Sequence, residues 1–185
     1  MPSKEDTEQL DPENVFPLIL NLISCFLHLM NNYMIEPSSA YYANSLGSND
    51  AMSGLMMGAS PCFALISSIG YSVWTNYSYR TPLILAGTLQ ITGNLMYGIA
   101  NSYHSMTLCL LGRAISGLGA PRIMNRRYVA DATPFSLRTA ASAAFAMATA
   151  VGAATGPGMA IVLDMFEFDF SLPFFGRQTF NGMTG

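Results

Sequence analysis

The chain has 185 residues, of which 51% are hydrophobic and only 10% are charged, and its formal net charge is −3. Soluble domains usually carry about 25% charged residues, and an overall negative charge leaves no basic footprint for nucleic acid. Charged residues are absent from four long stretches, 14–35, 51–79, 81–112 and 139–163. Because about 20 mostly apolar residues can cross a bilayer, this pattern favours an integral membrane protein over a soluble, disordered or disulfide-rich one.

The predicted elements follow these stretches in chain order. Residues 1–13 are polar and acidic and lack the basic start of a signal peptide, so we expect a cytosolic tail. Residues 164–185 are too polar to cross the membrane, and Pro173 and Gly176 interrupt them, so we expect a non-cytosolic loop with at most a weak strand. The predicted fold is an all-α, polytopic membrane helical bundle with spans at about 14–35, 51–74, 82–100, 105–128 and 138–163.

The basic residues predict the orientation of this bundle. Five spans place most of them on the side of the N-terminus, and the opposite loops contain Arg177 alone. Cytoplasmic loops carry the excess of Lys and Arg, so the N-terminus is expected in the cytosol. The sequon Asn76-Tyr77-Ser78 then faces the cytosol and is predicted to carry no glycan. The basic residues assigned to the cytosolic side are Lys4, Arg80, Arg122, Arg126, Arg127 and Arg138.

Polar residues recur on one face of the first and of the third span. Residues three or four apart share a helical face, and an unsatisfied polar group in hydrocarbon costs several kcal/mol. These faces are therefore expected to contact other helices or a watery cavity. Hydrogen bonding between helices and binding of a substrate are equally open readings. The candidates are Asn21, His28 and Asn31 in the first span, with Ser24 beside them, and Gln90 and Asn94 in the third, with Tyr97.

Arg113 is the one charged residue expected several turns inside a span. Arg at a bilayer centre costs roughly 2.5–3.5 kcal/mol on insertion scales, and such residues face the bundle interior and pair with an anionic group. Glu36, Asp50 and Asp131 are the acids nearest to the spans, and all three lie at span edges. Its partner could be a substrate anion, a carboxylate, which a missing second half could supply, or the carbonyl groups at a helix end. We expect a functional role for Arg113, with a substrate anion as one candidate partner.

A second basic group follows at the end of the fourth span. Arg122 and Arg126 are one turn apart and share a face, and with Asn125 they could form a vestibule that attracts anions. For these two arginines, anion attraction and ordinary anchoring at the membrane surface remain open. Arg127 and Arg138 are assigned to anchoring, with a salt bridge to Asp131.

Small residues mark places where helices can approach closely. Gly54 and Gly58 have the spacing of a packing motif in the second span. In the fifth span, a Gly-Pro-Gly sequence is expected to bend the helix. The residues predicted to serve packing or conformational change are Gly117, Gly119, Gly152, Gly156, Pro157 and Gly158, together with Asp131 and Arg138.

Several of these motifs resemble the major facilitator superfamily. Arg113-x-x-x-Gly117-x-Gly119 is similar to its fourth-helix motif, and Gly152-x-x-x-Gly156-Pro157-x-x-Ala160 to its fifth-helix motif. The loop Asp131-x-x-Pro134-x-x-x-Arg138 resembles the connection between those helices, whereas 74–82 departs from the usual acid–basic–glycine loop and keeps only Arg80. The segments 112–131, 74–83 and 93–100 resemble more closely the vacuolar phosphate transporters that contain an SPX domain.

The resemblance implies a transporter that moves inorganic phosphate across the vacuolar membrane, with Arg113, Arg122 and Arg126 as candidate phosphate contacts. It implies the first five helices of a facilitator fold, whose two halves have six helices each. We therefore expect a fragment without its SPX domain, whose partners are the lipid bilayer and a missing C-terminal half. The sequence shows no metal-ligand cluster and no nucleophile–base motif, so no enzyme activity, cofactor or metal is expected. Transport of another anion or small solute, and a non-transporting scaffold subunit, remain alternatives.

Overall fold

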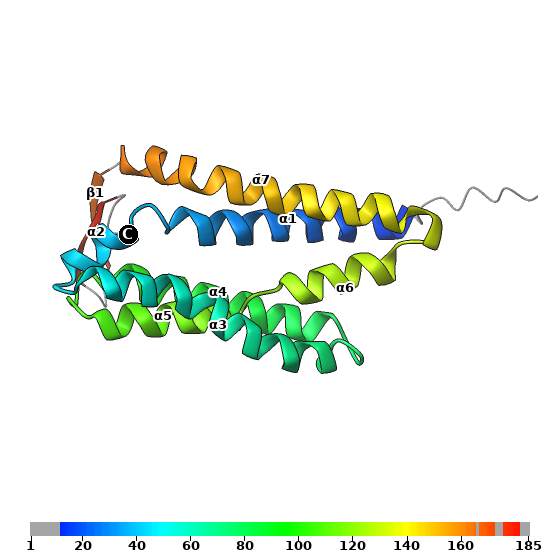
Figure 1. The fold of residues 1–185 in the computed structure, drawn as a ribbon, viewed down its shortest axis with the longest axis horizontal. Helices are drawn as coiled ribbons and strands as arrows, with labels where there is room; N and C mark the ends of the chain where they lie inside the picture. The colour runs from blue at the N-terminus through cyan, green and yellow to red at the C-terminus, as the bar shows by residue number, and fades with distance from the viewer. Residues whose placement is uncertain (1–11, 166, 173–175, 182–185) are drawn as a thin grey trace, which may run out of the picture.

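The computed structural model describes residues 12–165, 167–172 and 176–181 as a bundle of long helices with a short hairpin at one end (Figure 1). The all-α membrane bundle expected from the sequence is confirmed, with the hairpin added to it. Residues 1–11 of the predicted tail (1–13) and parts of the final loop, including Pro173, lie outside the described residues, and residues 12 and 13 belong to the first helix. The elements are α1 (Pro12–Met34), α2 (Ser39–Ser45), α3 (Asp50–Trp74), α4 (Arg80–Ile99), α5 (Met106–Leu118), α6 (Arg122–Ala132), the 3₁₀ turn η1 (Phe135–Leu137), α7 (Arg138–Asp164), β1 (Glu167–Leu172) and β2 (Gly176–Asn181).

The long helices run alternately between two ends of the bundle (Figure 1). The α6 end contains α6, η1, the start of α1 and the loop between α3 and α4. The α2 end contains α2, the connection from α4 to α5 and the antiparallel hairpin of β1 and β2. This alternation places Arg80 and the basic segment 122–138 together at the α6 end.

Three of the described segments are long and apolar enough to cross a membrane: Pro12–Met34, Ala51–Trp74 and Phe135–Leu163. Large apolar side chains point outward from them, as Leu65 and Ile69 in α3 and Ile161 in α7 show with exposures of 71%, 73% and 70%. Such exposure would be unfavourable in water and suits contact with lipid. That all five predicted segments cross the membrane stays a prediction.

The predicted fourth span, 105–128, contains two helices instead of one. α5 ends at Leu118, with Gly119 as its C-cap, and α6 begins at Arg122 after Pro121. Pro121 has no backbone N–H to donate and disfavours a helical conformation at the residue before it. The hydroxyl of Tyr71 donates to the carbonyl of Leu118 at 2.9 Å and so ties α3 to the end of α5.

A short helix that the sequence did not predict, α2, closes the bundle between α1 and α3. Its Tyr42 is completely buried, and the Tyr42 hydroxyl donates to the carbonyl of Tyr97 in α4 at 2.6 Å. The side chain of Asn49 then caps α3 by accepting from the backbone N–H of Met52 at 3.2 Å. Because the cap begins α3 immediately after α2, the chain turns back here within a few residues.

The helices pack as two groups joined by α6. α1 lies along α7, and α5 packs against both α3 and α4, while α6 contacts α1, α3 and α7 (Figure 1). Backbone approaches at glycines make this packing possible. A Cβ atom built at each of these positions would lie within 3 Å of a neighbouring helix: Gly117 against Ser60, Gly119 against Ala86, Gly152 against Phe26, and Gly156 against Tyr33.

The Gly-Pro-Gly sequence of the fifth predicted span does not interrupt its helix. α7 is one helix from Arg138 to Asp164 with Pro157 inside it. The space beside Gly158 is open, because no atom lies within 4 Å of a Cβ built there. Gly158 therefore makes no close helix contact among the described residues, and its expected part in a bend or a conformational change stays a prediction.

Candidate functional site

Arg113 lies in the interior of the bundle, on the buried face of α5, and its side chain is 4% exposed. Its Nε donates to the carbonyl of Met56 in α3 at 3.5 Å, and its Nη1 has no hydrogen-bond partner in the described part of the chain. The guanidinium is therefore fixed at one nitrogen and free to donate at another. The interior position agrees with the expectation from the sequence.

A cavity of about 230 Å³ adjoins this guanidinium. Helices α1, α3, α5 and α6 contribute to its wall, and Ala120 of the break between α5 and α6 lies on it. Polar and charged side chains make up much of the lining although the bundle is apolar. They are His28, Asn32, Tyr33, Glu36, Ser60, Arg113 and Arg122.

Three neutral polar residues of this cavity, His28, Asn32 and Ser60, are linked by hydrogen bonds. His28 joins α1 to α4 through Gln90, with Nδ1 within 3.2 Å of the Gln90 amide, and its Nε2 lies 3.2 Å from the Asn32 amide nitrogen. The Ser60 hydroxyl donates to the Asn32 Oδ1 at 3.4 Å. The two readings of the polar face in α1 are therefore compatible, because the same residues bond between helices and border a cavity.

A second, more open cavity of about 600 Å³ lies between α1 and α4. Asn31, Gln90 and Asn94 line it, and the Asn31 amide donates to the Asn94 Oδ1 at 3.4 Å. Asn21 lines neither cavity. It is 7% exposed, and its Oδ1 has no partner among the described residues.

Arg122 and Arg126 line a third cavity, of about 200 Å³, between α6 and α7. Ser142 and Thr149 of α7 contribute hydroxyl groups to it. Arg122 also lines the cavity of Arg113. The three arginines thus follow one another from the α6 end toward the interior of the bundle.

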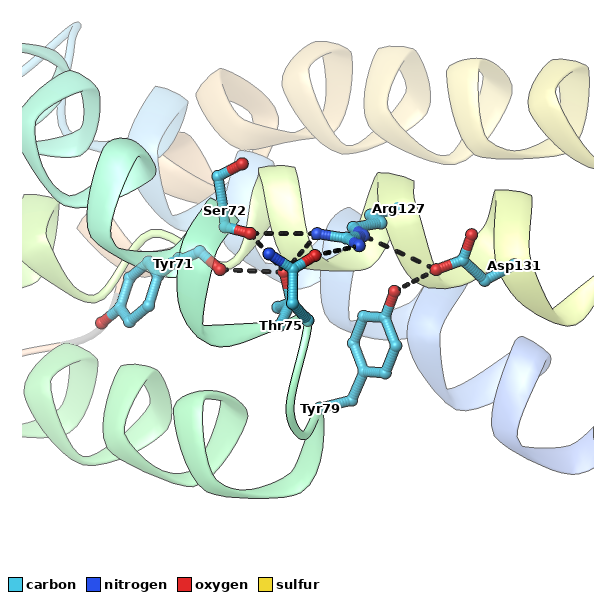
Figure 2. Close-up of polar contacts among 7 residues, drawn as sticks. Tyr71, Ser72, Thr75, Tyr79, Arg127 and Asp131 are labelled. Atoms are coloured by element: carbon cyan, nitrogen blue, oxygen red, sulfur yellow. Dashed lines mark hydrogen bonds and ion pairs between the residues drawn. The ribbon is translucent and has the colours of Figure 1, made fainter.

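The loop between α3 and α4 is held to α6 by Arg127 and Asp131 (Figure 2). Arg127 donates to the carbonyl of Ser72 at 3.0 Å and to the hydroxyl of Thr75 at 3.1 Å, and it forms a salt bridge of 3.6 Å with Asp131. The Tyr79 hydroxyl donates to the Asp131 carboxylate, at the same oxygen that forms the salt bridge with Arg127. Burial, together with that carboxylate, raises the pKa of Tyr79 to about 12, so the phenol keeps its proton and can donate even in mildly alkaline solution.

This geometry agrees with the structural role assigned to Arg127 but separates Arg138 from Asp131. Arg138 donates from Nε to the carbonyl of Thr133 at 3.4 Å, and its guanidinium lies 5.7 Å from the ring centre of Phe135. Arg138 therefore stabilises the turn before α7, and Arg127 takes the salt bridge with Asp131 in the described residues.

Three residues of these sites were not singled out as site residues from the sequence. They are Ser60 and Glu36, which line the cavity of Arg113, and Tyr79, which bonds Asp131. Ser60 could have been found from its spacing, because it follows Ser53 by seven residues, about two helical turns, and both are buried. Glu36 was noted as an acid at a span edge, but its position on the cavity depends on the corner between α1 and α2. Within the part of the chain that the structure describes, no group of three His, Cys, Asp or Glu side chains could hold a metal ion.

Comparisons with known proteins agree with the motifs. Residues 22–176 match the model of the Major Facilitator Superfamily. Two SPX domain-containing membrane proteins of Arabidopsis thaliana are similar to the chain, one at 39% identity over 89% of the chain and 24% of the relative, the other at 37% over 98% and 26%. A rice relative of the same description (Oryza sativa subsp. japonica) is 34% identical over 98% of the chain and 26% of its own length.

The chain spans about a quarter of the length of these relatives. No solved structure is significantly similar to it. The family resemblance predicted from the Arg113, Gly152 and Asp131 motifs is confirmed by the match over residues 22–176, and the chain belongs to the Major Facilitator Superfamily.

Proposed function

We propose that this chain provides the anion-binding half of a transporter that moves inorganic phosphate across a vacuolar membrane. Arg113 carries the proposal. Its guanidinium is 4% exposed, and Nη1 lacks a partner among the described residues. A buried donor without a partner costs about 1–3 kcal/mol, and more when it is charged. An oxyanion in the adjacent cavity would supply the missing acceptor, and guanidinium groups bind phosphate in a bidentate manner.

The arrangement of the other arginines supports an anion route. Arg126 and Arg122 line the cavity at the α6 end, and Arg122 reaches the cavity of Arg113 as well. With the N-terminus in the cytosol, as the basic loops predict, phosphate would enter from the cytosol past Arg126 and Arg122. The vacuolar location rests on the resemblance of segments 112–131 and 74–83 to vacuolar phosphate transporters. Besides lipid, we propose that a second helical half covers the substrate route.

Uptake of labelled phosphate into vesicles tests this function. The protein is expressed in the longest form that its reading frame encodes, with Arg113→Met as the variant and Arg80→Met as the matched control. Arg80 is exposed at the α6 end and lines none of the three cavities. We expect Arg113→Met to reduce uptake at least about tenfold, since charge-assisted hydrogen bonds contribute about 1.5–3 kcal/mol, and Arg80→Met to leave it unchanged.

Stability separates a lost substrate contact from misfolding. Because Arg113 leaves a buried donor unpaired, a methionine of similar length should preserve or raise the thermal midpoint of the protein. Unchanged uptake in Arg113→Met would contradict the role of Arg113. Phosphate uptake that excess malate or nitrate suppresses as well as unlabelled phosphate does would favour a less selective anion transporter.

A further inference from the structure

The cavity of Arg113 contains a carboxylate as well as guanidinium groups. Glu36 follows the end of α1 and lines the same 230 Å³ cavity as Arg113 and Arg122. Glu36 is close enough to Arg113 to interact with it electrostatically. It is not ion-paired, because the salt bridge of Arg127 and Asp131 is the one formed among the described residues. The carboxylate is therefore available to a bound molecule.

The backbone around Glu36 is fixed, whereas its side chain is exposed and lines the cavity. The carbonyl of Glu36 accepts from the backbone N–H of Ser39 at 3.3 Å and from the Ser39 hydroxyl at 2.8 Å. Ser39 is 3% exposed and begins α2. This corner holds Glu36 at the α2 end of the cavity, while Arg122 borders it from α6.

Of the other polar side chains that line the cavity, which include Tyr33 and Arg122, those of His28, Asn32 and Ser60 are hydrogen-bonded to other side chains. Both ring nitrogens of His28 are within hydrogen-bond distance of amides, and the Asn32 amide contacts His28 through its nitrogen and Ser60 through its oxygen. A molecule in the cavity thus finds a free donor at Arg113 and a free anionic acceptor at Glu36. An ionised carboxylate can only accept hydrogen bonds.

We propose that Glu36 is a specificity-determining residue that selects oxyanions carrying a proton over oxyanions without one. Phosphate keeps at least one proton at neutral pH, and its P–OH group can donate to Glu36 while its unprotonated oxygens accept from Arg113. Sulfate has no proton at this pH, so it would meet Glu36 with like-charge repulsion and an unsatisfied acceptor. A site built to bond a hydroxyl discriminates strongly against a molecule that lacks it. This inference rests on the proposed phosphate transport.

Competition during uptake of labelled phosphate tests the inference in the same vesicles. Arsenate is the protonated probe and sulfate the unprotonated one. In the unaltered protein, arsenate should compete and sulfate should be at least about tenfold weaker, one charge-assisted hydrogen bond being sufficient for that difference. Glu36→Gln, whose amide can also donate, should make sulfate about tenfold more competitive while arsenate changes little. Glu36→Asp keeps the carboxylate and should keep the rejection of sulfate.

Glu13→Gln is the matched control, because Glu13 is exposed in the first turn of α1 and lines none of the three cavities. It removes the same charge and should leave the competition pattern unchanged. If sulfate competes as well as arsenate in the unaltered protein, the inference is overturned, and this result requires no variant. Glu36→Gln with unchanged selectivity and uptake that still depends on Arg113 would overturn it as well. Absence of phosphate uptake by the unaltered protein would instead overturn the proposed function, and the inference with it.

Discussion

The close approach of α5 to α3 at Gly117 gives a quantitative prediction for folding. A Cβ added at Gly117 would lie 2.3 Å from the carbonyl oxygen of Ser60 and 2.9 Å from its Cα. The oxygen is about 1 Å closer than ordinary van der Waals contact allows. Because the clashing atoms belong to the backbone, no side-chain rotation relieves them. Gly117→Ala therefore requires the two helices to separate.

The size of the effect follows from comparison with an open position in the partner helix. Gly58 of α3 has no atom within 4 Å of a built Cβ. Both substitutions gain the helix propensity of alanine, about 1 kcal/mol, so this gain cancels between them. What remains is the overpacking at Gly117, about 1–3 kcal/mol. At about 2–4 °C per kcal/mol for chains of this size, Gly117→Ala should melt about 2–12 °C below Gly58→Ala.

The assay is the fraction of protein that remains monodisperse in detergent after heating, measured for both variants and for the unaltered protein. Gly58→Ala should match or exceed the unaltered protein, and Gly117→Ala should fall below both. Separation of the helices would also displace Arg113, which lies one turn before Gly117 on the same face of α5. Equal melting midpoints for the two variants would refute the reasoning, because they would show that the contact between Gly117 and Ser60 yields without cost.

Two further predictions concern the α6 end. Arg127→Met removes the hydrogen bonds to Ser72 and Thr75 and should reduce the free energy of opening of the 75–79 loop by roughly 1–2 kcal/mol. Limited chymotrypsin digestion in this loop should then be about 5–30-fold faster. An unchanged digestion rate would show that these bonds do not hold the loop. The sequon at Asn76 should carry no glycan, because the basic loops place it in the cytosol; a mobility shift on endoglycosidase treatment would reverse the orientation proposed for the whole bundle.

The helices could be predicted from the sequence because the absence of charge has a direct physical cause. The spans predicted at 14–35, 51–74, 82–100 and 138–163 agree with the helices α1, α3, α4 and α7 to within about two residues. Arg113 could be placed in the interior for the same reason, since an arginine facing lipid is costly. The sequence left open whether the polar faces of α1 and α4 bond to each other or bind a substrate, and it did not give the partners, such as Gln90 for His28. A polar helical face predicts that partners exist, but the side chain across from it is fixed by tertiary packing.

The features that escaped prediction depend on where the chain turns. α2 lies in a loop that the charge pattern treats as a connection, and its burial comes from contacts of Tyr42 with Tyr97, 55 residues away. Glu36 lines the cavity because the α2 corner holds it there. Helix propensity and hydropathy do not contain this information, because both describe residues within a few positions of one another.

The break between α5 and α6 has the largest consequence for function. Arg113 and Arg122 are nine residues apart, which is about two and a half turns of an uninterrupted α-helix. In the continuous span expected from the sequence, the two side chains would therefore point in opposite directions. The interruption at Gly119 and Pro121 ends one helix and begins another with a new direction, and both arginines then line the same cavity. α4 can approach this break closely because residue 119 is a glycine: a Cβ there would lie 2.6 Å from the carbonyl oxygen of Ala86. Gly119 of the Arg113 motif and Pro121 just after it thus bring Arg113 and Arg122 together in space, which their sequence spacing alone would not predict.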